Sequence, residues 1–185
     1  MVSLRRWPPT ALQRGLRWLA ATRAGAWLFA RVLHRVDRVA FRLSGGRGTV
    51  TSALSGLPVV MLTTTGARTG MLRTVPVLGF PINGETAVAA GNFGRPGEPA
   101  WCVNLRRHPR AEITSGGRRQ PVVAEELSGV TREDVWRRAI EIYPGAAAYQ
   151  RRAGGRTIGV FLLHEDHRRP GEGRPDEQGG REARR

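Results

Sequence analysis

Residues 61–77 read MLTTTGARTGMLRTVPV and place a glycine-hinged turn between two strand-like runs. Arg68 stands inside the turn and Arg73 follows it, and guanidinium groups match the oxygens of phosphate and carboxylate. A glycine-rich turn also exposes backbone N–H groups. Hydroxyl donors accompany the turn at Thr63, Thr64, Thr65, Thr69 and Thr74. These residues alone leave two interpretations open: an anion-binding turn, or a solvated arginine hairpin whose threonines suit strands.

The turn lies in a series of short strand-like runs. The pattern predicts strands over 57–63, 73–80, 86–90, 110–114, 118–127 and 157–163. Asn83-Gly84 and Gly116-Gly117 predict hairpin turns between neighbouring strands. Helices are predicted over 100–108 and 131–143, the second with Thr131 as the expected N-cap and acidic residues in its first turn. Six short strands with few helices indicate a mainly β fold with helices (α+β), a small barrel rather than a doubly wound sheet.

The chain divides into three segments by composition. Residues 1–47 are predicted to form a basic amphipathic helical segment, with ten arginines and one aspartate. Residues 48–164 form the predicted barrel domain, and residues 165–185 a disordered charged tail rich in glycine and proline. Residues 1–43 could lie on an anionic membrane surface, or pack on their own domain with the arginines in solvent. Their apolar runs are too short to span a bilayer.

The formal charge of +15 predicts an anionic partner. Nucleic acid is disfavoured, because no aromatic residue except Trp101 interleaves with the arginines of residues 106–119. Cys102 is the only cysteine, which excludes an internal disulfide and favours a cytoplasmic location, with peripheral membrane contact as an addition. The four histidines lack zinc-ligand spacing, so no metal site is predicted.

Several short motifs occur in one order and resemble those of the deazaflavin (F420)-dependent nitroreductases, also described as F420H2-dependent quinone reductases. The turn of that family reads T-T-G-[RK]-[RK]-[ST]-G-x-x-R-x-x-P and corresponds here to residues 64–76. A loop at 90–94 and a helix motif, PAWCVNLR with His108-Pro109, follow in the family's order. Tyr143-Pro144, Tyr149-Gln150 and residues 156–158 also match. The resemblance covers residues 55–163.

By this resemblance the fold is a split β-barrel, FMN-binding-like, preceded by an N-terminal helical segment. The cofactor implied is coenzyme F420, an 8-hydroxy-5-deazaflavin whose phosphate and oligoglutamate tail make it a polyanion. The turn would then hold this tail, with arginine and threonine side chains and backbone N–H groups as donors. The resemblance implies cofactor-binding roles for Arg68, Thr69, Gly70, Arg73, Thr74, Ala90, Gly91, Asn92, Ala100, Trp101 and Asn104.

The chemistry implied is hydride transfer from reduced F420 to an electron-poor small molecule such as a quinone, a nitro compound or an activated double bond. Tyr149 matches the family position for a proton donor or oxyanion-stabilising group, with Tyr143 as a supporting wall. Both tyrosines could instead attach the helical region 131–153 to the barrel. Trp101 could likewise pack the helix on the barrel rather than contact the cofactor.

The chain departs from the family pattern at four positions. Ala67 replaces the first of two basic residues, Gly91 a common serine, Cys102 an aromatic residue, and Ala146 a further tyrosine. The replacements at Gly91, Cys102 and Ala146 predict a larger acceptor pocket and an altered acceptor range. Other functions stay open at this point, namely a split barrel that uses FMN or another cofactor, and a non-catalytic basic protein at a membrane surface. The sequence determines neither the natural acceptor nor the oligomeric state.

Overall fold

A computed structural model describes residues 15 and 58–167 of the chain, and the predicted N-terminal helical segment lies outside these residues. The described strands are β1 (Val59–Thr65), β2 (Leu72–Ile82), β3 (Glu85–Ala89), β4 (Arg110–Ser115), β5 (Arg118–Glu126) and β6 (Val160–Glu165). The described helices are the short 3₁₀ helix η2 (Asn92–Gly94) and the α-helices α5 (Ala100–Arg107), α6 (Gly129–Ile142) and α7 (Gly145–Arg152).

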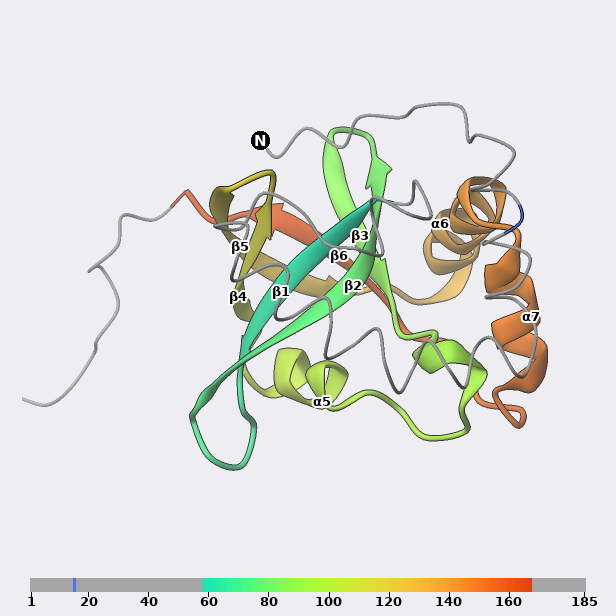
Figure 1. The fold of residues 1–185 in the computed structure, drawn as a ribbon, viewed down its shortest axis with the longest axis horizontal. Helices are drawn as coiled ribbons and strands as arrows, with labels where there is room; N and C mark the ends of the chain where they lie inside the picture. The colour runs from blue at the N-terminus through green and yellow to red at the C-terminus, as the bar shows by residue number, and fades with distance from the viewer. Residues whose placement is uncertain (1–14, 16–57, 168–185) are drawn as a thin grey trace, which may run out of the picture.

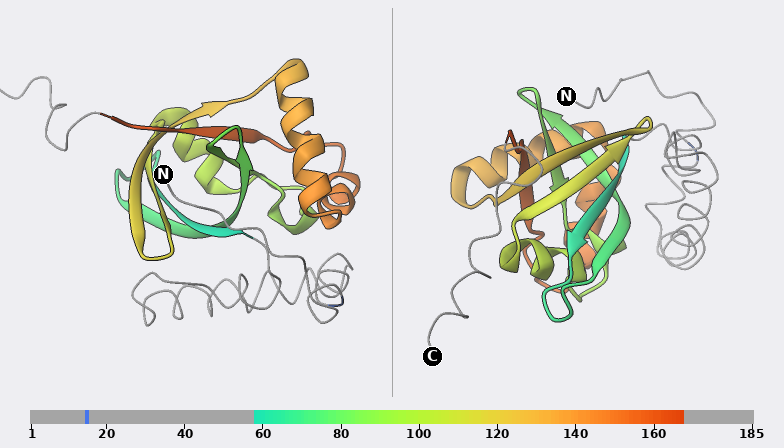
Figure 2. Two further views of the ribbon diagram at one scale, coloured as in Figure 1. Left: turned by 90° about the horizontal axis from the view of Figure 1, so that it is seen from above. Right: turned by 90° about the vertical axis from the view of Figure 1, so that its left-hand side faces the viewer.

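The strands form a closed barrel in the order β1-β2-β3-β6-β5-β4, and every neighbouring pair is antiparallel (Figure 1). Helix α5 lies across one end of the barrel, while α6 and α7 lie beside its wall (Figure 2). This arrangement confirms the predicted α+β split barrel. The interior is packed with aliphatic and aromatic side chains, among them Val60, Leu62, Ile113 and Phe161.

The two predicted hairpin turns are confirmed. Asn83 and Gly84 connect β2 to β3 with φ angles of 48° and 89°. Gly116 and Gly117 connect β4 to β5 with φ angles of 58° and 79°. Two successive residues with positive φ give a turn whose twist matches that of the flanking strands, and glycine and asparagine tolerate this conformation best.

Several element boundaries differ from the prediction. Helix α6 begins two residues before Thr131, after Ser128 in extended conformation, so the predicted N-cap and acidic first turn are wrong. The predicted helix 131–143 ends as expected before Pro144, which cannot continue the hydrogen-bond ladder of α6, and a second helix, α7, follows it. Strand β6 includes Glu165, and the Asp166 N–H donates to the Pro121 carbonyl. The barrel therefore continues past the predicted domain boundary at residue 164.

His164 on β6 joins three neighbouring strands of the barrel. Its Nδ1 lies 2.6 Å from Glu85 Oε1 at the start of β3, and its Nε2 lies 2.9 Å from Glu125 Oε2 on β5. Hydrogen bonds with Glu125 and then with Glu85 raise the pKa of His164 above its ordinary value. The imidazolium form therefore holds β3, β6 and β5 together, and the neutral ring can donate only one of these two bonds.

We expect the free energy of unfolding to fall as the pH rises through the pKa of folded His164. A pKa raised by folding contributes stability that is fully present below the unfolded value, about 6.5, and is lost above the folded value. Urea denaturation between about pH 5.5 and 9 measures this, and His164→Gln should flatten the profile. His167→Gln, an exposed histidine beyond the strand, is the matched control. Parallel profiles for wild type and His164→Gln would contradict the assignment.

Candidate functional site

The turn between β1 and β2 is a compact, internally bonded loop. The Gly66 N–H donates to the Met71 carbonyl at 2.9 Å, and the Gly70 N–H donates to the Gly66 carbonyl at 2.8 Å. A Cβ atom on Gly66 would lie 2.9 Å from Thr69 Oγ1, which is closer than real Cβ atoms approach. Gly70 has a φ of +65°, the left-handed region that glycine adopts at least cost. The two glycines therefore determine the shape of this turn.

Arg68 and Arg73 present their guanidinium groups to solvent from this turn, and the Thr69 side chain is exposed beside them. Neither arginine forms a salt bridge with a carboxylate in the described part of the chain. Arg73 makes one long contact, from Nη2 to Met71 Sδ at 4.0 Å. Two cations without carboxylate partners on a rigid turn fit an anionic ligand such as a phosphate or carboxylate tail.

The expected backbone donors of the turn are mostly used inside the protein. The N–H groups of Gly66 and Gly70 bond within the loop, and the Ala67 N–H donates to Asn104 Oδ1 at 2.9 Å. Thr74 Oγ1 lies 2.9 Å from Thr63 Oγ1, so these hydroxyls pair across β1 and β2. The expectation that backbone N–H groups and clustered threonines complete the tail site stays a prediction, and these particular donors have partners within the protein. The donors that face solvent are side chains of Arg68, Thr69 and Arg73.

Asn104 on α5 connects the turn to the helix. Its Oδ1 accepts the Ala67 N–H, and its Nδ2 donates to the buried Thr64 Oγ1 at 2.9 Å. The side chain is itself buried, so both ends of the amide are matched within the protein. Asn104 was predicted to orient polar parts of the cofactor. Its contacts instead hold the arginine-bearing turn against α5.

The loop between β3 and α5 contains three further residues that were predicted to bind the cofactor, namely Ala90, Gly91 and Asn92. Ala90 is buried, and its N–H donates to the Gly159 carbonyl at 2.9 Å. Asn92 has a φ of +44°, and its Nδ2 donates to the Gly97 carbonyl at 2.6 Å. The predicted ligand-orienting amide of Asn92 thus also bonds inside its own loop. Gly91 lies between them and is partly exposed.

The first residues of α5 separate into an exposed and a buried position. Ala100 is exposed, whereas Trp101 is buried and packs edge-on against Phe161 with ring centroids 5.5 Å apart. Of the two roles expected for Trp101, packing of the helix on the barrel is the one this contact supports. Ala100 is the part of the motif that faces outward.

Tyr143 and Tyr149 form a buried hydrogen-bonded pair, with their hydroxyl oxygens 2.9 Å apart. Their rings meet edge to face at a centroid distance of 5.8 Å. Tyr143 also packs tightly on Gly145, where a Cβ atom would lie 2.3 Å from Tyr143 Cζ. Burial, followed by the charge and hydrogen bond of Tyr143, raises the pKa of Tyr149 well above its ordinary value. The Tyr149 hydroxyl therefore stays protonated and able to donate.

Three of the residues that depart from the family pattern, Gly91, Cys102 and Ala146, are surrounded by other side chains. A Cβ atom on Gly91 would lie 3.2 Å from Tyr149 Cδ2, so the tyrosine ring occupies the space next to this glycine. Cys102 and Ala146 belong to the hydrophobic core. Burial raises the pKa of the Cys102 thiol well above its ordinary value, which leaves it unreactive. The packing does not support the expectation that these positions enlarge an acceptor pocket.

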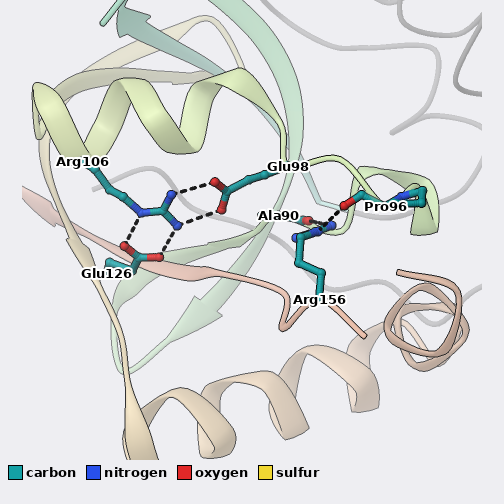
Figure 3. A network of polar contacts seen from close by, with 6 residues as sticks. All are labelled: Ala90, Pro96, Glu98, Arg106, Glu126 and Arg156. Atoms are coloured by element: carbon teal, nitrogen blue, oxygen red, sulfur yellow. Dashed lines mark hydrogen bonds and ion pairs between the residues drawn. The ribbon is translucent and has the colours of Figure 1, made fainter. Parts of the chain in front are cut away.

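Sequence reasoning missed the residues that hold this site together. Arg106 binds the carboxylates of Glu98 and Glu126, and Arg156 donates to backbone carbonyls of the 90–96 segment (Figure 3). The guanidinium of Arg152 lies over the Tyr149 ring, 5.3 Å from its centroid. Arg106 and Arg156 fall in matched motifs, but their roles depend on partners distant in the sequence.

The structure is a split β-barrel with an exposed cationic turn and a buried tyrosine pair. A sequence model described as F420H(2)-dependent quinone reductase matches residues 33–165, well over half of the chain. The chain therefore belongs to the F420H(2)-dependent quinone reductase family. It is an oxidoreductase that uses coenzyme F420, and the predicted family, activity class and cofactor are confirmed.

Two solved structures resemble this chain in fold and sequence. One, described as an F420-H2 dependent reductase (FDR-A), is 38% identical over 58% of this chain and 94% of its own, with a TM-score of 0.53. Another, described as a domain-swapped dimer, is 34% identical over 70% of this chain and 97% of its own, with a TM-score of 0.54. Among the helices of the described residues, none has the length and apolar character needed to cross a membrane.

We expect Asn104→Ala to destabilise the protein by about 1–3 kcal/mol, because it leaves the Ala67 N–H and the buried Thr64 hydroxyl without their partner. The Ala67 amide should also lose its protection from hydrogen exchange, which reports on the turn directly. Val103→Ala, on the exposed face of the same helix, is the matched control and should change stability by less than about 0.5 kcal/mol. Unchanged protection of Ala67 in Asn104→Ala would rule out this connection.

Proposed function

We propose that this protein transfers a hydride from reduced F420 to an electron-poor small molecule, with a quinone as the leading acceptor class. Nitro compounds and activated double bonds accept a hydride by the same chemistry and belong to the acceptor range to be tested. The observation that carries the proposal is the rigid turn whose two arginines have no carboxylate partner among the described residues. It fits the polyanionic tail of the family's cofactor.

The protein's part in this reaction is binding, orientation and supply of a proton. Arg68 and Arg73 bind the phosphate or the tail carboxylates, and Thr69 adds a hydroxyl donor. Ala100, which faces outward, and the Ala90–Asn92 segment form the wall beside the ring. When bound, reduced F420 supplies the hydride, which carries both electrons of the two-electron reduction. The acceptor then needs one proton to complete its reduction.

Tyr149 is the proposed group for this proton. Its hydroxyl remains protonated, because burial raises its pKa, and it is hydrogen-bonded to the Tyr143 hydroxyl. A protonated phenol stabilises the developing oxyanion by hydrogen bonding, and because its raised pKa makes it a weak acid, its proton follows only once negative charge has built up on the acceptor. Tyr143 supports the ring and holds the Tyr149 hydroxyl by a hydrogen bond, and the proton consumed in each turnover is replaced from solvent. The roles expected from the sequence, proton donor for Tyr149 and supporting wall for Tyr143, stay proposals.

Peripheral membrane contact through residues 1–43 and a cytoplasmic location stay predictions. Those residues lie outside the part of the chain that the structure describes. Contact with a membrane surface would suit a lipid-soluble quinone, because acceptor and enzyme would then meet at the same interface. The oligomeric state is not proposed.

We expect Arg68→Ala and Arg73→Ala each to weaken the binding of oxidised F420 about tenfold, which corresponds to about 1.4 kcal/mol. The loss should shrink as salt is raised, because these side chains are exposed and screened. Fluorescence titration measures the Kd, with FMN as a second ligand. Arg118→Ala removes an equal charge at the β4–β5 hairpin, the opposite end of the barrel, and should leave the Kd within about twofold. Equal losses in all three variants, or tighter binding of FMN, would contradict the tail site.

We expect Tyr149→Phe to lower kcat for a water-soluble quinone about a hundredfold while F420 affinity stays unchanged. The substitution keeps the aromatic ring, so its packing on Gly91 is retained and only the hydroxyl is lost. Stopped-flow measurement of cofactor oxidation separates this step from binding. Wild-type kcat in Tyr149→Phe would show that the proton comes from another group.

A further inference from the structure

The loop of residues 90–99, between β3 and α5, has few hydrogen bonds of its own. Within it, the Gly94 N–H donates to the Gly91 carbonyl, the Arg95 N–H to the Asn92 carbonyl, and Asn92 Nδ2 to the Gly97 carbonyl. Asn92 and Gly94 have φ angles of 44° and 78°, a left-handed conformation that asparagine and glycine tolerate best but that fits only a loop of specific shape. A loop of this kind requires contacts from elsewhere in the protein to remain in one conformation.

Arg156, which precedes β6, supplies such contacts at the start and middle of the loop. Its Nη2 donates to the Ala90 carbonyl at 3.2 Å and to the Arg95 carbonyl at 3.4 Å, and its Nε donates to the Pro96 carbonyl at 3.1 Å. One guanidinium group thus joins backbone positions five and six residues apart. Figure 3 shows Arg156 directed toward the Ala90 and Pro96 carbonyls.

Arg156 is itself held in place by its neighbours. Its carbonyl accepts a hydrogen bond from Gln150 Nε2 at 2.8 Å, and Gln150 Oε1 accepts the Ile158 N–H at 3.2 Å. Gln150 on α7 therefore bonds the segment after this helix at two positions, the Arg156 carbonyl and the Ile158 N–H. The Arg156 guanidinium binds neutral carbonyls and no carboxylate in the described residues.

Arg106 on α5 holds the other end of the same loop. Its Nη1 and Nη2 bind the two oxygens of Glu98 at 2.7 and 2.8 Å. Its Nε and Nη2 bind the two oxygens of Glu126, at the end of β5, at 2.6 Å each. Two bidentate carboxylates on one guanidinium give a fixed, planar geometry (Figure 3). The end of the loop is thereby connected to both α5 and β5.

We propose that Arg156 and Arg106 are positioning residues that hold the 90–99 loop in the conformation that binds F420. This inference rests on the proposed function, in which the Ala90–Asn92 segment forms a wall beside the cofactor ring. A preorganised loop binds more tightly, because the ligand does not have to order it. If a variant adopts the binding conformation for only a tenth of the time, its apparent Kd rises tenfold.

Glu98→Gln is the sharpest test, because two mechanisms predict opposite results. The substitution removes a negative charge, so long-range electrostatics predicts equal or tighter binding of the polyanionic cofactor. Release of the loop from Arg106 predicts weaker binding. We expect the Kd for oxidised F420, measured by fluorescence titration at fixed ionic strength, to rise about threefold to tenfold. A Kd at or below that of the wild type would overturn the role of Arg106 and Glu98.

Arg156→Met tests the other contact, with Arg151→Met as its charge-matched control. Arg151 is exposed on α7, so its replacement removes the same charge without touching the loop. We expect Arg156→Met to raise the Kd for F420 and the KM for reduced F420 about tenfold. Its kcat at saturating cofactor should stay within about threefold of wild type, because bound cofactor selects the competent loop. Equal effects in Arg151→Met and Arg156→Met would overturn the proposal, since charge alone would then explain them.

Arg156→Lys keeps the charge but lacks the planar fork that reaches three carbonyls, and should behave like Arg156→Met rather than wild type. Thermal melting identifies any variant that fails to fold, and Glu98→Gln then carries the test alone. Wild-type protein that binds FMN but not F420 would overturn both the proposed function and this inference. Wild-type binding of F420 with unchanged Kd values in Glu98→Gln and Arg156→Met would overturn only the inference.

Discussion

Closure of the barrel through β1 is the constraint on which the site depends. β1 pairs with β2 along one edge and with β4 along the other, with Thr64 opposite Arg73 on one side and Ala111 on the other. A strand bonded on both edges cannot slip in register without breaking two ladders. The turn that follows β1 is therefore held at one end of the barrel, where α5 lies. Asn104 then completes the connection between turn and helix.

Arginine serves three different physical purposes around this site. Arg68 and Arg73 lie in solvent without a carboxylate partner in the described chain, which suits an anionic ligand. Arg106 is neutralised by Glu98 and Glu126, and the hydrogen bond from Arg106 lowers the pKa of Glu98. Arg156 binds backbone carbonyls. The same side chain thus acts as ligand-binding group, ion-pair centre and loop support, according to what surrounds it.

Much of the fold could be predicted from local patterns in the sequence. Asn83-Gly84 and Gly116-Gly117 predicted their hairpins, because a two-residue hairpin turn needs positive φ at both central residues, and asparagine and glycine adopt it at least cost. The start of α6 was predicted wrongly, since Thr131 is a favourable cap by type but lies inside the helix that Ser128 precedes. The end of the same helix was predicted correctly to within one residue, because Pro144 cannot continue the hydrogen-bond ladder of α6.

The candidate site was predicted in part. The resemblance placed Arg68, Arg73 and Thr69 together, and the structure leaves them exposed on one turn. It also assigned cofactor contacts to Asn104 and Trp101, whose side chains bond and pack inside the protein. Residue type alone cannot separate these cases, because an asparagine or tryptophan suits a ligand and a core contact equally well.

The sequence by itself determined the strands, the hairpins, the family and the excess of positive charge, since these follow from local pattern, composition and motif order. Only the tertiary structure decided which donors remain available to a ligand. The partner of Ala67 lies 37 residues away at Asn104, and the partner of Arg156 lies 66 residues away at Ala90. A hydrogen bond depends on distance in space, and closing the barrel sets those distances between segments far apart in the chain.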